Sequence, residues 1–125
     1  MEYNTIFSKI PCGVPQTTKE FITNFLLSVL ETNNKDTIKE KIKKIYLYDF
    51  TVSGNLQNIT EIGLIIIIDE TYKNEYNKIT DDIDEKEFCI EEKYNYNYLL
   101  SITCDMFDNY DTKQSVLLYD KENDC

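Results

Sequence analysis

Hydrophobic residues follow a helical spacing in the first third of the chain. A stripe of apolar side chains repeats every three or four positions after Thr17 or Thr18, either of which is a suitable N-cap. The stripe consists of Phe21, Ile22, Phe25, Leu26, Val29 and Leu30. This spacing predicts a helix that ends near residues 32–34. Residues 1–16, which contain both prolines, are expected to form an irregular lead-in.

The centre of the chain changes to a strand-like pattern. Residues 45–49 alternate, and residues 62–68 form an apolar run interrupted only by Gly63. A turn containing Gly54 separates the two strands. A continuous apolar run is typical of a strand that is buried on both faces, so we expect helices on both sides of the sheet. A short helix capped by Asp36 or Thr37 is expected before the first strand.

The second half predicts shorter elements, which we take in chain order. They are a helix over 71–79, an acidic loop over 81–87, a short strand over 88–90, a strand over 99–104, a strand or apolar segment over 115–119, and a polar tail over 120–125. Together the elements predict one domain over residues 1–125, of α/β or α+β class. Its core would be a small mixed sheet of about four strands covered by helices.

The composition excludes several kinds of catalytic site. The chain has no His and no Arg, and its 13 basic residues are all Lys. Without His there is no Ser–His or Cys–His nucleophile pair and no His ligand for zinc. Without Arg there is no bidentate clamp on phosphate and no arginine finger.

The net charge of −10 is unevenly distributed along the chain. Residues 1–45 hold seven Lys against five acidic residues, whereas residues 46–125 hold six Lys against 18 acidic residues. A field of this sign repels nucleic acid and anionic membranes and attracts basic surfaces. We therefore expect no direct binding of nucleic acid or membrane, and a basic protein as partner.

The four cysteines indicate neither a disulfide framework nor a zinc site, because none of them form a C-x-x-C pair. No signal peptide is recognisable, and the longest uninterrupted apolar run, residues 64–68, is too short to span a bilayer. The sequence predicts a cytoplasmic protein with reduced thiols and without a metal or cofactor.

Residues 42–70 carry a resemblance to a known family. The stretch KKIYLY at 43–48 is similar to the first strand of the minimal nucleotidyltransferase domain, the antitoxin-type member of the polymerase-beta-like superfamily. TEIGLI at 60–65 lies where that family has Ser-Asp-Ile-Asp and an apolar strand, and Gly54 lies where it has a later glycine. The resemblance implies a small α/β fold with a nucleotide site between these strands.

The residues that do the chemistry in that family are replaced here. Asp49 and Phe50 stand in place of the Gly-Ser turn that approaches the triphosphate. Glu61 and Gly63 stand in place of the two metal-binding aspartates, and Asp105 after a later strand is a possible third carboxylate. Two-metal phosphoryl transfer needs several carboxylates around one site. The resemblance therefore implies a degenerate, non-catalytic member of the family.

Our leading hypothesis is a non-catalytic acidic module that inhibits a basic nucleic-acid-handling protein such as a nuclease. Immunity proteins, antitoxins and phage anti-defence inhibitors are of this type. Acidic residues would steer association and tyrosines would supply affinity. The candidate residues are Asp81, Asp82, Asp84, Glu85, Glu87, Glu91, Glu92, Tyr94, Tyr96 and Tyr98.

Three other interpretations stay open. In the first, the tyrosines face the core from a strand and the acidic residues form a solvated loop. In the second, the chain is a metal-dependent nucleotidyltransferase of antitoxin type that uses Asp49, Glu61 and Asp105. In the third, it is a structural or accessory subunit without a charge-driven partner.

Overall fold

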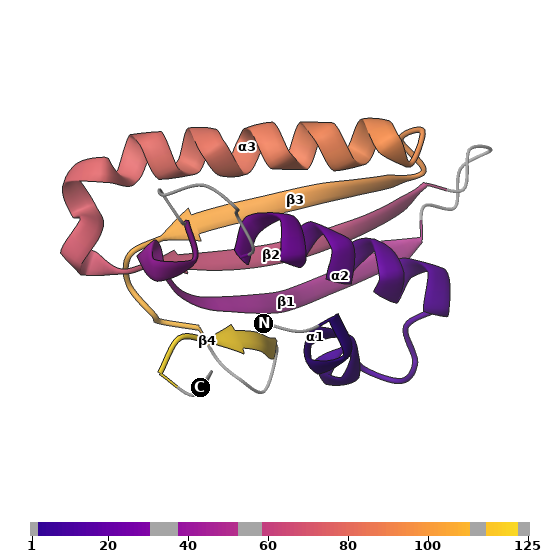
Figure 1. Cartoon of the computed structure of the whole chain (residues 1–125). Helices are drawn as coiled ribbons and strands as arrows, with labels where there is room; N and C mark the ends of the chain where they lie inside the picture. The colour runs from indigo at the N-terminus through magenta and orange to yellow at the C-terminus, as the bar shows by residue number, and fades with distance from the viewer. Residues whose placement is uncertain (1–2, 31–37, 53–58, 111–114, 123–125) are drawn as a thin grey trace.

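A computed structural model describes residues 3–30, 38–52, 59–110 and 115–122. The element order is α1 (Tyr3–Lys9), α2 (Gln16–Leu30), the 3₁₀ turn η1 (Ile38–Lys41), β1 (Ile42–Val52), β2 (Thr60–Ile68), the 3₁₀ segment η2 (Glu70–Glu75), α3 (Tyr76–Lys93), β3 (Tyr98–Asp105) and β4 (Val116–Asp120) (Figure 1). The expected positions Asp36, Thr37 and Gly54 lie outside the described residues.

The four strands form one mixed sheet in the order β3-β2-β1-β4. β1 and β2 pair as an antiparallel hairpin, and β4 pairs antiparallel with the other side of β1. β3 runs parallel to β2, with α3 as the crossover between them. Parallel neighbours need such a crossover, which explains why the longest helix lies between these two strands. The sheet confirms the predicted fold class.

β2 is the most buried strand of the sheet, as its apolar run predicted. Ile65 is its most exposed isoleucine, with 5% of its surface accessible, and Ile62, Ile66, Ile67 and Ile68 are fully covered. The central position of β2 accounts for this, because both its edges are paired and both its faces are packed.

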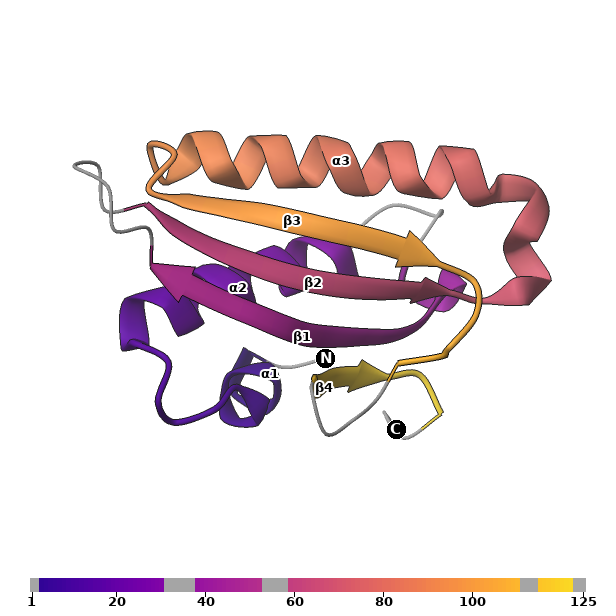
Figure 2. The ribbon, with the colours of Figure 1, turned by 180° about the vertical axis from the view of Figure 1, so that it is seen from behind.

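The helices lie on one face of the sheet, so the expectation of helices on both faces is wrong. α2 inserts its apolar stripe, including Phe21, Phe25 and Val29, into the main core, and α3 contributes Ile79, Ile83 and Ile90. Figure 2 shows the opposite face of the sheet, over which no described helix lies.

Aromatic side chains cover the opposite face instead. Tyr46, Ile65 and Ile67 form a second small cluster there, and Tyr110 and Leu117 pack against it. Residues 106–110 follow β3 and bring Tyr110 onto this face, with its ring centroid 6.2 Å from that of Tyr46. The connection over residues 106–110 therefore packs on the face where a second layer of helices was expected.

Four local expectations are wrong. The predicted acidic loop over 81–87 and short strand over 88–90 are parts of the continuous helix α3, because Ile79, Ile83 and Ile90 share one helical face and no Gly or Pro interrupts it. The lead-in over 1–16 contains α1, which buries Ile6. The expected short helix before the first strand is only the turn η1, since β1 already begins at Ile42.

None of the helices in the described part of the chain is both long and apolar enough to cross a bilayer.

Candidate functional site

The positions that resemble a nucleotidyltransferase site lie inside paired strands. Asp49 pairs with Gly63 and Phe50 pairs with Ile62 in the β1–β2 ladder. β1 continues to Val52, so Asp49 and Phe50 lie within a strand and not at the turn position that the resemblance assigned to them.

The sheet register separates the remaining carboxylates. Glu61 pairs with Leu99 near the start of β3, whereas Asp105 pairs with Ile67 near the end of β2. Six residues along parallel strands correspond to about 20 Å at roughly 3.3 Å per residue. Asp49 lies towards the Glu61 end, through its pairing with Gly63. Glu61, Asp49 and Asp105 therefore do not converge on one metal site.

Asp105 is engaged in the turn that follows its own strand. Its Oδ1 accepts hydrogen bonds from the backbone N–H groups of Met106 (2.7 Å) and Phe107 (3.1 Å), and its Oδ2 accepts one from the Tyr110 hydroxyl (3.1 Å). The Phe107 N–H is the main reason that the pKa of Asp105 is lowered, with Met106 and Tyr110 adding to it. These bonds give Asp105 a structural role in positioning Tyr110.

Asp108 ties the same connection to β1. Its carboxylate accepts hydrogen bonds from Lys44 Nζ and from the Tyr46 hydroxyl, each at 2.8 Å. Burial acts to raise the pKa of Asp108, but the bonds from Lys44 and Tyr46 outweigh it and the pKa is lowered. The group is a structural cluster whose polar atoms already have partners.

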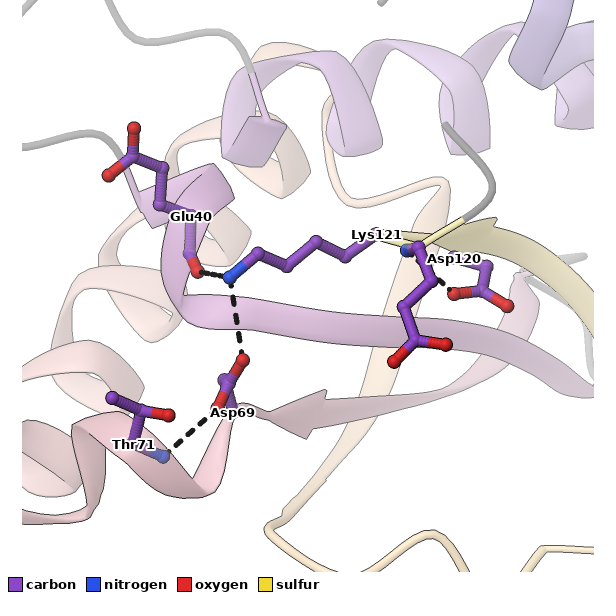
Figure 3. Close-up of polar contacts among 6 residues, drawn as sticks. Glu40, Asp69, Thr71, Asp120 and Lys121 are labelled. Atoms are coloured by element: carbon purple, nitrogen blue, oxygen red, sulfur yellow. Dashed lines mark hydrogen bonds and ion pairs between the residues drawn. The ribbon is translucent and has the colours of Figure 1, made fainter. Parts of the chain in front are cut away.

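Lys121 forms a second structural cluster at the end of the sheet where β1 begins and β2 ends (Figure 3). Its Nζ donates to the backbone carbonyl of Glu40 and to Asp69 Oδ2 (3.4 Å), while Asp69 Oδ1 accepts from the Thr71 N–H (2.9 Å). One lysine thus links the end of β4, the turn η1 and the start of η2. Asp69 acts as the N-cap of η2, so this cluster too serves the fold.

The candidate acidic residues all lie on α3, where they occupy different sides of the helix. Asp81, Asp84, Glu85 and Glu92 are exposed, whereas Asp82, Glu87 and Glu91 are half-buried. At about 100° per residue, the four exposed residues lie on the side opposite the buried isoleucines. We call the exposed set Asp81, Asp84, Glu85, Phe88 and Glu92 the acidic stripe.

Phe88 lies at the centre of the acidic stripe and was not predicted from the sequence. Its side chain is 57% exposed, among the highest values for a large hydrophobic residue in the described part of the chain. The signal was available, because residues 79, 83 and 90 define the buried face and Phe88 falls about 160° from its centre. The expected strand over 88–90 assigns Phe88 a strand period instead of a helical one, so its place opposite the buried face is not apparent.

Two of the three half-buried carboxylates of α3, Glu87 and Glu91, lie on the side of the helix that faces β3. Glu91 Oε2 accepts a hydrogen bond from the Leu100 N–H, and the Tyr76 hydroxyl donates one to the Cys104 carbonyl, each at 2.8 Å. Both backbone groups point away from β2, where an edge strand is otherwise open to pairing with another chain. Glu91 and Tyr76 therefore protect the sheet edge.

Glu87 lies on the same side of α3, between these two contacts. Burial, followed by the charges of Glu91 and Asp84, raises its pKa to about 7. Burial also raises the pKa of the Cys104 thiol to about 11, with contributions from Asp84 and Glu87. Burial and mutual repulsion among these acidic residues therefore disfavour the charged forms of Glu87 and Cys104.

The three candidate tyrosines have different environments. Tyr94 and Tyr98 pack against Phe21, with centroid distances of 5.0 and 4.8 Å, and Tyr94 accepts a hydrogen bond from the Asn24 side chain. Tyr96 is 45% exposed and follows α3, with a positive φ of 57°. Of the three, only Tyr96 presents an exposed ring.

Comparison of the chain with protein-family models, with curated proteins and with solved structures finds no match. The resemblance to nucleotidyltransferases stays a prediction. Within the described ranges, no group of three His, Cys, Asp or Glu side chains is placed to hold a metal ion.

Proposed function

We propose that this protein is an acidic binding module that inhibits a basic nucleic-acid-handling protein, such as a nuclease, in the cytoplasm. The proposal rests on the exposure of Phe88, whose side chain is 57% exposed at the centre of the acidic stripe on α3. An exposed aromatic ring surrounded by carboxylates combines the two features of a charge-steered protein interface.

The two parts of the stripe have separate roles. Asp81, Asp84, Glu85 and Glu92 attract a basic surface and accelerate association, although each exposed charge adds only about 0–1 kcal/mol to affinity. Phe88 slows dissociation, since burying one such side chain contributes about 1.5–3 kcal/mol. A helix held against such a surface inhibits the partner by excluding its nucleic acid, which requires no catalytic residue.

A second exposed aromatic ring follows the end of α3. Tyr96 is exposed four residues after Glu92, and the chain turns there through the positive φ angles of Asn95 and Tyr96. Tyrosine is enriched in interfaces because it offers a large contact area at low conformational cost. Tyr96 is therefore a second anchor for the same partner.

The nucleotidyltransferase alternative is less favoured, because the sheet register keeps Glu61 and Asp105 about 20 Å apart. An accessory subunit without a charge-driven partner differs from our proposal in its salt dependence. Binding through the acidic stripe weakens steeply as salt screens the charges, whereas binding through an uncharged interface does not.

The test starts from purified basic nucleases and other basic nucleic-acid-binding proteins, with partners found by binding and by loss of their activity. Association rates are then compared at low and high salt for two variants. The stripe variant carries Asp81→Asn, Asp84→Asn, Glu85→Gln and Glu92→Gln. The control carries the same charge change at exposed residues off the stripe, Glu40→Gln, Glu61→Gln, Glu70→Gln and Glu122→Gln.

We expect the stripe variant to associate at least about tenfold more slowly at low salt, and the control variant to stay near wild type. Phe88→Ala should mainly raise the dissociation rate. The proposal fails if a partner is found whose binding responds neither to salt nor to the stripe substitutions. It also fails if both four-residue variants are equally impaired.

A further inference from the structure

A groove of about 750 Å³ runs between α2 and α3, on the side of α3 that faces α2. Figure 1 shows the two helices that flank it. Asn24 and Ser28 of α2 and Lys41 of η1 form one wall. The opposite wall is a row of α3 side chains that includes Lys78, Lys86 and Lys93.

The charge of this groove is opposite to that of the chain as a whole. Among the described residues, four lysines line the groove, against the two acidic residues Asp82 and Glu85, while the whole chain carries −10. Lys41 is paired with Glu75 at 2.9 Å. For Lys78, Lys86 and Lys93, no ion pair is present among the described residues. These three ammonium groups are available to an anionic ligand.

The three lysines set the length of the ligand. They are separated by eight and seven residues along α3, which places their Cα atoms about 12 Å and 10 Å apart at 1.5 Å per residue. The row is therefore about 22 Å long. An extended peptide rises about 3.3 Å per residue, so about seven residues cover the row.

The remaining lining residues restrict the chemistry of the ligand. The apolar floor is almost closed, since Ile38, Ile79 and Ile90 are at most 7% exposed, so a purely hydrophobic ligand gains little by binding. No aromatic ring is among the described residues that line the groove, so a nucleobase finds no stacking platform.

Asp82 and Glu85 favour a peptide over a continuous polyanion as the ligand of this groove. Their carboxylates repel an unbroken row of phosphates more strongly than a peptide whose charges alternate with neutral residues, and a peptide also has N–H groups that can donate hydrogen bonds to them. Asn24 and Ser28 supply further polar groups to a peptide backbone. We propose that this groove binds an acidic peptide segment of a partner protein, about seven residues long, in extended conformation.

This inference does not rest on the function proposed for the acidic stripe. The groove and the stripe lie on adjacent sides of α3 and share only Glu85. Their opposite charges select different partner surfaces. The protein therefore offers one site for a basic surface and another for an acidic segment.

Cys89 provides a direct reporter of groove occupancy, because it is an exposed free thiol that lines the groove. Cys12 is an exposed free thiol in the connection between α1 and α2, outside the groove residues, and serves as the internal control. Alkylation of each cysteine is followed by mass spectrometry of its peptide. The probe is a pool of seven-residue peptides with Asp or Glu at alternate positions and varied uncharged residues between them.

Two matched variants localise the effect. The groove variant carries Lys78→Gln, Lys86→Gln and Lys93→Gln. The control variant carries Lys9→Gln, Lys43→Gln and Lys73→Gln, which gives the same net charge from lysines outside the groove. Parallel samples contain inorganic pentaphosphate or a single-stranded oligonucleotide in place of the peptides.

We expect saturating acidic peptides to slow alkylation of Cys89 at least about threefold and to leave Cys12 unchanged. The groove variant should weaken this protection about tenfold or more, since it loses all three contacts, while the control variant retains it. Unchanged alkylation of Cys89 in the wild type overturns the inference. So does equal protection by pentaphosphate or the oligonucleotide, which indicates a general anion site, or equal loss of protection in both variants.

Discussion

The ring of Tyr48 on β1 covers the backbone of Gly63 on the neighbouring strand β2. A Cβ atom placed on Gly63 would lie 2.6 Å from Cζ of Tyr48, closer than van der Waals contact allows. The ladder has a register shift between Leu47, which pairs with Leu64, and Asp49, which pairs with Gly63, and Tyr48 is the extra residue at this shift. Gly63 thus has a packing reason to be glycine, whatever the origin of the chain.

We expect Gly63→Ala to destabilise the protein by about 1 kcal/mol, because the half-exposed Tyr48 ring must move. In a Tyr48→Ala background the same substitution should be neutral or stabilising by about 0.5–1 kcal/mol, since glycine is unfavourable inside a strand. Denaturant unfolding of the wild type, both single variants and the double variant measures the coupling. An equal cost of Gly63→Ala in both backgrounds contradicts the packing explanation.

Local patterns predicted the strands well and the charged helix poorly. The run at 62–68 identifies β2, because a strand that is buried along its whole length requires an uninterrupted series of apolar residues. The sequence pattern divides α3 into a helix, a loop and a strand, because the three isoleucines whose spacing defines the helix stand among seven acidic residues. Tertiary burial of Ile79, Ile83 and Ile90 outweighs that local polarity.

The geometry of the candidate sites was beyond sequence patterns for a different reason. Whether Glu61 and Asp105 meet depends on the direction and register of β2 against β3, which the chain does not encode locally. The groove lysines are distributed over residues 41, 78, 86 and 93, and only the packing of α3 beside α2 and η1 brings them together. The acidic residues of α3 were predicted, but Phe88 was not.

We expect Ile66→Asp to prevent soluble folding. Ile66 is fully buried in the central strand, where an unpaired carboxylate costs several kcal/mol, comparable to the stability of a whole domain. Ser101→Asp is the matched control, since Ser101 is exposed on the adjacent strand β3. The soluble fraction and the melting curve are measured for both. A folded Ile66→Asp protein with a wild-type melting temperature contradicts the burial of β2.

Glu87 makes stability depend on pH in an unusual direction for a carboxylate. Its pKa is raised from 4.5 to about 7 by burial and by Glu91 and Asp84, with Cys104 facing it from β3. The folded state therefore holds the proton more tightly than the unfolded state. It follows that the free energy of unfolding falls as pH rises from about 4.5 to about 7.

Glu87→Gln should remove this slope and raise stability at pH values above about 7. The gain is about 1 kcal/mol, less than the full shift implies because solvent screens a half-exposed group. Glu85→Gln, exposed on the opposite side of the helix, changes the net charge equally and should leave the slope in place. Denaturant unfolding across this pH range measures both variants. A Glu87→Gln protein that keeps the wild-type slope contradicts the assignment.

We expect no nucleotidyl transfer by this chain. Two-metal catalysis holds its ions roughly 3.5–4 Å apart, so the carboxylates must converge within a few ångströms. Glu61 and Asp105 pair with residues at opposite ends of the β2–β3 ladder, and Asp105 already accepts three hydrogen bonds within its own turn. Incubation with labelled ATP, Mg²⁺ and candidate acceptor proteins should leave every acceptor unlabelled. Metal-dependent labelling that Glu61→Ala abolishes, while the exposed control Glu70→Ala retains it, would refute this expectation and favour the enzymatic alternative.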